Sequence, residues 1–471
     1  MNNLRRIICR AHLICTIAFI NSLLINQSIS YCQPTLIEKD VYIKIMDYAN
    51  NVKVIDTHEH QHWPEEYAPL PFNFYHLLQG GYLMNDVISA GSKRLDWEKI
   101  TALDNKDGWE LFGQALNYSR NTSYYGQLVK GFQRLYDFDD KYFTKSNIPL
   151  LSSEIEKNYA DYRTWFDVSF RKAGFELMFK DQYWNYFNTE IDTQYYALVF
   201  RVNPLIKQIS SKPSGNENIP DIYIKAQNGG IEIDSLDDYL AFCDKIFQKN
   251  IEKKAVSIKN GVAYSRSLDF VDIPYESARI LFDKPSAQLS QLEEKQLQDF
   301  MFHRIIEKAI QYDLPIQIHT GYLAGNGNVL DNGNPVRLNN LFLKYPKAKF
   351  ILFHGGFPWT GIYTAFGKMF QNVYLDIVWL PQISRHHAIQ AFDEMLDCVP
   401  YNKFFWGGDC KFIEESTGSL EYGKEIVAEV LSRRIERGLL TEEVAFEIVR
   451  RIFRENAIEV FQLEQRLGRK F

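Results

Sequence analysis

The sequence predicts an α/β protein built on a (β/α)8 barrel (TIM barrel), with a helical insertion after the first strand. Three observations predict it: eight short apolar runs with the character of strands, helical patterns between the later runs, and polar residues at the ends of several of them. Short strands that alternate with amphipathic helices are typical of a parallel sheet with crossover helices. Eight such strands suit a closed barrel, in which the carboxyl ends of the strands surround the active-site mouth.

The predicted strands are short apolar stretches bounded by turn or helix signals. They cover Val52–Ile55, Phe175–Phe179, Tyr196–Val202, Ala255–Lys259, Pro315–His319, Lys349–His354, Asn372–Ile377 and Lys403–Asp409. Helical patterns such as Glu293–Tyr312 and Ser384–Asp397 lie between the later strands. The last four strands recur at intervals of about 30 residues, the length of one βα unit.

The stretch between about residues 64 and 165 has a different pattern. It is aromatic, charged and helical, without clear strands. We expect it to form a helical insertion that caps the barrel mouth, within a barrel domain that covers residues 31–471. The segment Ser210–Gly230 carries prolines and paired glycines and is predicted to be a loop or a small excursion from the barrel.

The first thirty residues differ in composition from the rest of the chain. Three arginines among the first ten residues precede an apolar run over 13–25, and small residues follow at Ser28 and Ser30. This pattern predicts a signal peptide over residues 1–30 and export to the periplasm or out of the cell. A short membrane anchor is one alternative, and lipid attachment at Cys32 is another, although the bulky residue before that cysteine counts against it.

The charge and cysteine content exclude several kinds of partner and site. The 471 residues include 53 Lys and Arg against 59 Asp and Glu, a net charge of −6, which gives no basic surface for nucleic acid. The six cysteines form no C-x-x-C pair, which argues against a disulfide scaffold or a thiolate zinc site. A small-molecule substrate is the expected partner, and a homo-oligomer is compatible with the sequence.

The strongest single chemical signal is Asp56-Thr57-His58-Glu59-His60, at the end of the first predicted strand. Successive side chains alternate across a strand, so His58 and His60 are expected to face the same side. Two imidazoles in this arrangement can share one metal cation. A His-x-His pair is common by itself, and its weight here comes from the other strand ends.

Three further predicted strands end in a residue that can bind a metal or accept a proton: His319, His354 and Asp409. One histidine at a strand end is more often structural. Three strands that end in this way, after a His-x-His strand, are hard to obtain by chance. The alternation also places Lys259 and His319 on the polar faces of their strands, which are expected to look into the barrel.

The order His-x-His, strand-four Lys, strand-five His, strand-six His and strand-eight Asp resembles the amidohydrolase superfamily. More narrowly, the chain resembles the amidohydrolase domain that in some proteins precedes a glutamine-synthetase-like domain, from about residue 50 to the C-terminus. The motifs that carry this resemblance are Gly81-Tyr82, Ser89-Ala90-Gly91, Ser119-Arg120-Asn121-Thr122, Lys259 with Ala263-Tyr264, Ile318-His319-Thr320-Gly321, His354-Gly355-Gly356-Phe357-Pro358-Trp359 and Val373-Tyr374-Leu375-Asp376.

The resemblance implies a metal-dependent hydrolase with one or two divalent ions, zinc before other metals. It makes His58, His60, His319 and Asp409 the metal ligands. It also makes Asp409 the base that takes a proton from water activated by the metal. His354 would bind a second ion, or it would hold the substrate carbonyl and stabilise its developing negative charge.

The sequence leaves more than one interpretation open for Lys259 and for Arg266. Lys259 is either carboxylated on its amine and bridges two metal ions, or it binds a substrate carboxylate or pairs with Glu59. Arg266 either binds an anionic group of the substrate or is an ordinary surface residue of the loop after the fourth strand.

The function that the resemblance favours is hydrolysis of an amide-type C–N bond in a small, carboxylated molecule. The same scaffold resembles that of metal-dependent lyases, decarboxylases and sugar-acid isomerases, which are the nearest alternatives. A barrel that binds a ligand without converting it is a third possibility. The presence of every type of metal ligand in the sequence counts against that one.

Overall fold

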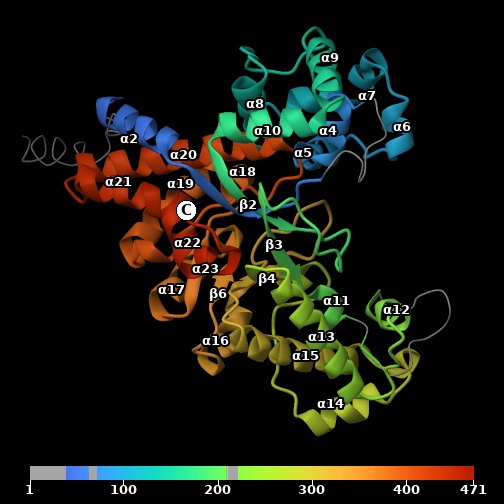
Figure 1. The fold of residues 1–471 in the computed structure, drawn as a ribbon. Coiled ribbons are helices and arrows are strands. Elements are labelled where there is room, and N and C mark those ends of the chain that lie inside the picture. Colours follow the sequence, from blue (N-terminus) through green and yellow to red (C-terminus); the bar gives the residue numbers. More distant parts are fainter. Residues whose placement is uncertain (1–38, 63–71, 208, 211–220) are drawn as a thin grey trace, which may run out of the picture.

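The computed structural model describes residues 39–62, 72–207, 209–210 and 221–471. Eight parallel strands form a barrel in which each strand pairs with the next one in sequence (Figure 1). They are β1 Val54–Glu59, β2 Phe175–Asp181, β3 Tyr196–Arg201, β4 Ser257–Asn260, β5 Ile316–Ile318, β6 Phe350–Leu352, β7 Val373–Asp376 and β8 Phe404–Phe405. The predicted fold class is confirmed. The predicted signal peptide and Cys32 lie outside the described residues.

Backbone hydrogen bonds join β1 to the segment that follows β8 and so complete the ring. The amide of Thr57 donates to the carbonyl of Trp406 at 3.3 Å. The amide of Asp409 donates to the carbonyl of His58 at 2.7 Å, and the amide of His60 donates to the carbonyl of Cys410 at 2.8 Å. We call residues 57–60 and 406–410, held together by these bonds, the closing junction. It places the His-x-His pair beside Asp409.

Five of the predicted strands extend too far at their carboxyl ends, β3 and β7 by one residue each and three others through a predicted site residue. The structure ends β5, β6 and β8 before His319, His354 and Asp409, which lie in the loops that follow. His354 and Asp409 have positive φ angles of 64° and 59°. This left-handed backbone conformation cannot continue a strand, and it costs a residue other than glycine roughly 1–3 kcal/mol.

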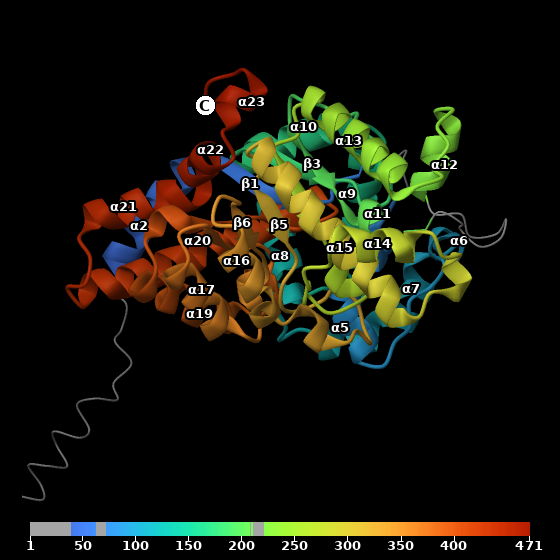
Figure 2. The same ribbon diagram turned by 90° about the horizontal axis from the view of Figure 1, so that it is seen from below.

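Helices surround the strands (Figure 2). Outside the interval between β1 and β2, the α-helices are α2 Lys39–Asn51, α11 Asn203–Ile206, α12 Asp221–Asn228, α13 Leu236–Glu252, α14 Tyr275–Phe282, α15 Gln291–Gln311, α16 Asn339–Lys344, α17 Thr360–Met369, α18 Leu380–Ile383, α19 Arg385–Cys398, α20 Ile413–Glu436, α21 Glu442–Arg450, α22 Asn456–Val460 and α23 Leu463–Leu467. Among the described residues, no helix is both long and apolar enough to span a membrane.

Between β1 and β2 the described residues form helices and no strand. These helices gather on one side of the barrel in Figure 1. They are α4 Phe74–Gly80, α5 Leu83–Ser89, α6 Trp97–Thr101, α7 Asn105–Tyr118, α8 Ser123–Leu135, α9 Ile148–Tyr159 and α10 Tyr162–Ala173. The helical stretch therefore continues beyond residue 165 to the start of β2.

Two glycines let the insertion helix α8 lie directly against α20. A Cβ atom on Gly131 of α8 would lie 2.0 Å from the carbonyl oxygen of Glu414, and one on Gly418 of α20 would lie 1.9 Å from that of Gln127. The two helix backbones are thus in contact with no room for a side chain between them. The buried Glu414 strengthens the same contact, because Tyr136, Tyr159 and Trp165 all donate hydrogen bonds to its carboxylate.

We expect Gly131→Ala to lower the free energy of unfolding by about 3 kcal/mol, because the added methyl group must push the two helices apart. Chemical denaturation followed by circular dichroism measures the change. Gly361→Ala is the matched control, since a Cβ there would meet nothing closer than 3.8 Å and alanine favours a helix. Equal stability of the two variants would show that the α8–α20 contact is not tight.

Candidate functional site

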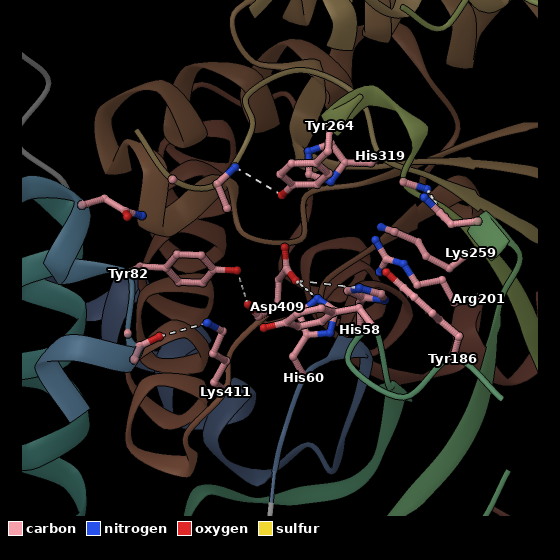
Figure 3. A pocket seen from close by; sticks show the side chains of 18 of the residues that line it. His58, His60, Tyr82, Tyr186, Arg201, Lys259, Tyr264, His319, Asp409 and Lys411 are labelled. Atoms are coloured by element: carbon pink, nitrogen blue, oxygen red, sulfur yellow. Dashed lines mark hydrogen bonds and ion pairs between the residues drawn. The ribbon is translucent and has the colours of Figure 1, made fainter. Parts of the chain in front are cut away.

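A cavity of about 480 Å³ opens at the carboxyl ends of the barrel strands. Its lining combines residues of β1, β3 and β4, the loops after β5 and β8, and the helical insertion. Figure 3 shows Asp409 in the middle of this cavity, with His58 and His60 beside it and Tyr264 and His319 facing it. The site predicted from the strand ends therefore coincides with a real cavity.

The His-x-His pair lies where the alternation predicts it. His58 and His60 both line the cavity, and their rings meet edge to face at a centroid distance of 4.8 Å. Both ring nitrogens of His58 are buried without a hydrogen-bond partner. Burial, with Lys259 nearby, holds the pKa of His58 well below its usual value. His58 is therefore a neutral imidazole with unused lone-pair capacity, as a metal ligand requires.

Asp409 lies within reach of both histidines. Its Oδ1 atom is 3.0 Å from Nε2 of His60 and 3.8 Å from Nε2 of His58. Its Oδ2 atom points the other way, 3.9 Å from Nε2 of His354. One oxygen thus faces the histidine pair, and the other remains available to a substrate or a water molecule.

Asp181, the last residue of β2, belongs to the same cluster. One ligand atom each from His58, His60 and Asp181 lie within 4.8 Å of one another. Oδ2 of Asp181 is 3.5 Å from Nε2 of His58 and also pairs with Arg201. Asp181 is not among the predicted site residues because the predicted strand stops at Phe179. The rule that polar residues matter at strand ends would have found it had the strand been drawn two residues longer.

His319 and His354 form a second imidazole pair next to the first. Nε2 of His354 lies 3.0 Å from Nδ1 of His319, and the other ring nitrogens contact the carbonyls of Val378 and Tyr322 at 3.0 and 2.8 Å. Burial holds the pKa of both histidines well below the usual value. His319 lines the cavity, whereas His354 lies behind it. His319 can bind a metal only if it gives up one of these contacts.

Lys259 reaches the cavity from β4, as its strand parity predicts. Its ammonium lies 3.5 Å from the centroid of the Phe353 ring, and burial lowers its pKa to about 7. A lysine of this kind is partly unprotonated near neutral pH, and carboxylation requires the unprotonated amine. The suggested pair with Glu59 is not formed, because that carboxylate turns away from the cavity and accepts a hydrogen bond from the amide of Cys410 at 2.9 Å.

Arg266 does not line the central cavity. Its guanidinium pairs with the buried Asp299 at 2.8 Å and also donates to the carbonyls of Ser267 and Asp269. The structure therefore gives Arg266 protein partners in place of an anionic group of the substrate. Its side chain is largely buried, so it is not an ordinary surface residue either.

Buried carboxyl groups hold the loop that carries Asp409. Asp56 accepts hydrogen bonds from the amides of His58 and Gly408, at 3.1 and 3.0 Å. Burial raises the pKa of Asp56 to about 7, and burial next to Asp56 raises the pKa of Glu59 well above its usual value. The two carboxyl groups therefore share a proton. From the insertion, Tyr82 donates its hydroxyl to the carbonyl of Asp409 at 2.6 Å.

The residues present fit a divalent metal ion. The donors are two imidazoles and two carboxylates, His58, His60, Asp181 and Asp409, a set typical of zinc and related cations. The unpartnered nitrogens of His58 are the strongest sign, since buried polar atoms are otherwise hydrogen-bonded in native proteins.

Comparison with known proteins supports the barrel fold. A family model described as Amidohydrolase matches residues 281–463. Glucuronate isomerase from Caulobacter crescentus superimposes with a TM-score of 0.74 at 14% identity, over 92% of this chain and 96% of that one. Uronate isomerase from Thermotoga maritima gives 0.72 at 13% identity, over 90% and 98%. A Lactobacillus casei ATCC 334 protein, assigned to the metal-dependent hydrolases, gives 0.62 at 16% identity, over 90% and 98%.

At these identities the structural similarity shows the fold alone. None of the curated proteins compared with the chain matches it. The narrower resemblance to domains that precede a glutamine-synthetase-like domain stays a prediction.

We expect His58→Ala to lower the affinity for zinc or manganese by more than about 100-fold. Loss of a residue that only supports a metal ligand already lowers metal affinity by about 10–100-fold, and His58 would itself be a ligand. Asp181→Asn should also weaken binding, since it removes one carboxylate donor. Chelator competition and elemental analysis of the purified protein measure both effects. His386→Ala, an exposed histidine of α19, is the control. If all three variants retain the metal equally, the cluster is not a metal site.

Proposed function

We propose that the protein is a metal-dependent hydrolase that cleaves an amide-type C–N bond in a small, carboxylated molecule. The observation that carries this proposal is the position of Asp409. One of its oxygens faces the His58–His60 pair, and the other is open to the cavity. A carboxylate that is both beside metal donors and accessible to a substrate is suited to accept a proton from water.

A divalent cation held by His58, His60, Asp181 and Asp409 would polarise the bond under attack and lower the pKa of water towards neutrality. The protein's own groups supply the remaining functions. Asp409 accepts the proton through Oδ2, and the hydrogen bond from Tyr82 to its carbonyl fixes its position. The closing junction fixes the backbone that carries this carboxylate beside the histidines.

Tyr264 is suited to stabilise negative charge on the substrate. It lines the cavity, and its hydroxyl oxygen accepts a hydrogen bond from the amide of Ala324 at 3.2 Å. Its own hydrogen is therefore available to donate into the cavity. A donor preorganised in this way stabilises the oxyanion that forms when water adds to a carbonyl group.

Isomerisation of a sugar acid is the second candidate. It is favoured by the extent of the similarity to glucuronate isomerase, which includes more than nine-tenths of both chains. The same carboxylate could move a proton between neighbouring carbon atoms of a sugar acid in place of accepting one from water. Both candidates require a metal and an anionic substrate.

Parallel assays of the metal-loaded protein separate the two candidates. One series contains N-acyl amino acids and γ-glutamyl amides, with release of the amine followed by mass spectrometry. The other contains uronic acids, with formation of the keto sugar followed by NMR. Turnover in the first series alone supports hydrolysis, turnover in the second alone replaces it with isomerisation, and turnover in neither rejects both.

We expect Asp409→Asn to lower kcat on the substrate identified by these assays by about 10²–10⁴-fold, the usual contribution of a general base. The carboxamide can still offer an oxygen to the metal but cannot accept the proton, so metal content should change little. Steady-state kinetics and elemental analysis test both parts. Asp139→Asn, at an exposed position, controls for the loss of one acidic group, and activity within a few-fold of wild type would remove Asp409 from this role.

A further inference from the structure

The cavity is cationic although the chain is acidic. Its lining contains five Lys and Arg side chains and a single carboxylate, that of Asp409. The cations are Arg94, Arg201, Lys207, Lys259 and Lys411. The whole chain, in contrast, carries a net charge of −6. Positive charge is therefore concentrated at the cavity, where it would attract an anion and raise its local concentration.

Most of these cations form no ion pair among the described residues, and Lys411 meets the charge of Glu415 only from beyond ion-pair distance. Arg201 is the exception, because it pairs with Asp181. Arg94 donates to the carbonyl of Gln79 and to the side chain of Asn85, and Lys411 donates to the carbonyl of Gly80 at 3.2 Å. These acceptors are neutral, so they satisfy hydrogen bonds but do not balance charge.

The unbalanced cations occupy two places. Arg94 and Lys411 bind the consecutive carbonyls of Gln79 and Gly80 at the end of α4, so they lie together at the insertion side of the cavity. Lys207 follows α11 and lies near Arg201 at the end of β3. Figure 3 shows Lys411 and Arg201 on opposite sides of Asp409. Lys259 belongs to neither place, because it lies beside the metal donors.

We propose that this cavity recognises a small molecule with two separate carboxylates, one held by Arg94 and Lys411 and the other by Lys207 with Arg201. A volume of about 480 Å³ suits a ligand of this size. The reacting bond would then lie between the two carboxylates, over Asp409. The position of the reacting bond rests on the proposed function. The binding of a dianion does not depend on it. For a hydrolase, the substrate class would be an N-acyl derivative of an acidic amino acid or a related amide diacid.

A capping role for Arg94 and Lys411 is the main alternative. Cations are favourable at a helix C-terminus, where backbone carbonyls lack partners. Such a role accounts for the contacts with Gln79 and Gly80. It does not explain why Lys207 lines the cavity or why cations outnumber carboxylates there. It also predicts that loss of Lys411 changes stability and leaves ligand affinity unchanged.

Calorimetry with glutarate and pentanoate tests the proposal, because these probes have the same number of carbon atoms and differ in one carboxylate. Metal-loaded wild-type protein should bind glutarate at least about 10-fold more tightly than pentanoate. Lys411→Met and Lys207→Met should each remove most of this difference, whereas a carboxylate that binds only the metal would be unaffected by them. Lys368→Met, an exposed lysine of α17, is the control for loss of one positive charge.

Thermal melting of each variant separates recognition from capping. If Lys411→Met melts early, Lys207→Met carries the test, since Lys411 donates to a carbonyl at the end of α4 and Lys207 has no such bond among the described residues. Lys411→Arg should retain the preference for glutarate. Equal affinity for the two probes, or no effect of either methionine variant, would overturn the proposal. If the amide and uronate assays fail but the preference for glutarate holds, the proposed reaction is rejected and the dianion site is retained.

Discussion

The backbone hydrogen bonds of the closing junction determine the geometry of the site. The carbonyl of His58 accepts from the amide of Asp409, and the carbonyl of Cys410 accepts from the amide of His60, so ligands from opposite ends of the chain come together. Carboxyl groups that face away from the cavity reinforce the junction. Asp56 accepts from the amide of Gly408, and Glu59 accepts from that of Cys410. A Cβ on Gly408 would lie 2.1 Å from Glu59. Only glycine therefore leaves room at this position for the carboxyl groups of Asp56 and Glu59.

The helical insertion contributes to the same junction in addition to covering the barrel mouth. Glu415 of α20 accepts from the amide of Tyr82 at 2.9 Å, and the Tyr82 hydroxyl reaches the carbonyl of Asp409. The ring of Tyr82 packs near that of Trp379, which has a positive φ of 62° in the loop after β7. The insertion, the barrel and the strained loops after β7 and β8 are therefore linked through one tyrosine. The tight contact between α8 and α20 holds the insertion at the distance that this link requires.

The fold and most of the site could be predicted from the sequence because both depend on short-range patterns. Each of the eight strands was found from its apolar run, and the alternation of side chains placed His58, His60 and Lys259 towards the cavity. Strand ends were less predictable, since the backbone at His354 and Asp409 becomes left-handed through contacts with distant segments. Arg266 was misleading because its proximity to Lys259 in the sequence does not reveal its partner Asp299, which lies on α15.

Protonation of buried carboxyl groups explains why little negative charge near the cavity balances its cations. Burial raises the pKa of Asp376 to about 7, as it does that of Asp56, and it raises the pKa of Glu59 well above its usual value. Near neutral pH these three groups are largely or partly protonated. Asp56 and Glu59 accept hydrogen bonds from the backbone of the closing junction, and Asp376 accepts one from the hydroxyl of Thr57. The negative charge needed to hold a metal cation must then come from Asp181 and Asp409. Arg201 offsets part of the charge of Asp181. Among the described residues no lysine or arginine of the cavity forms an ion pair with Asp409, although Lys259 interacts with it from a longer distance. The positive charge that these cations contribute is left for a ligand to balance.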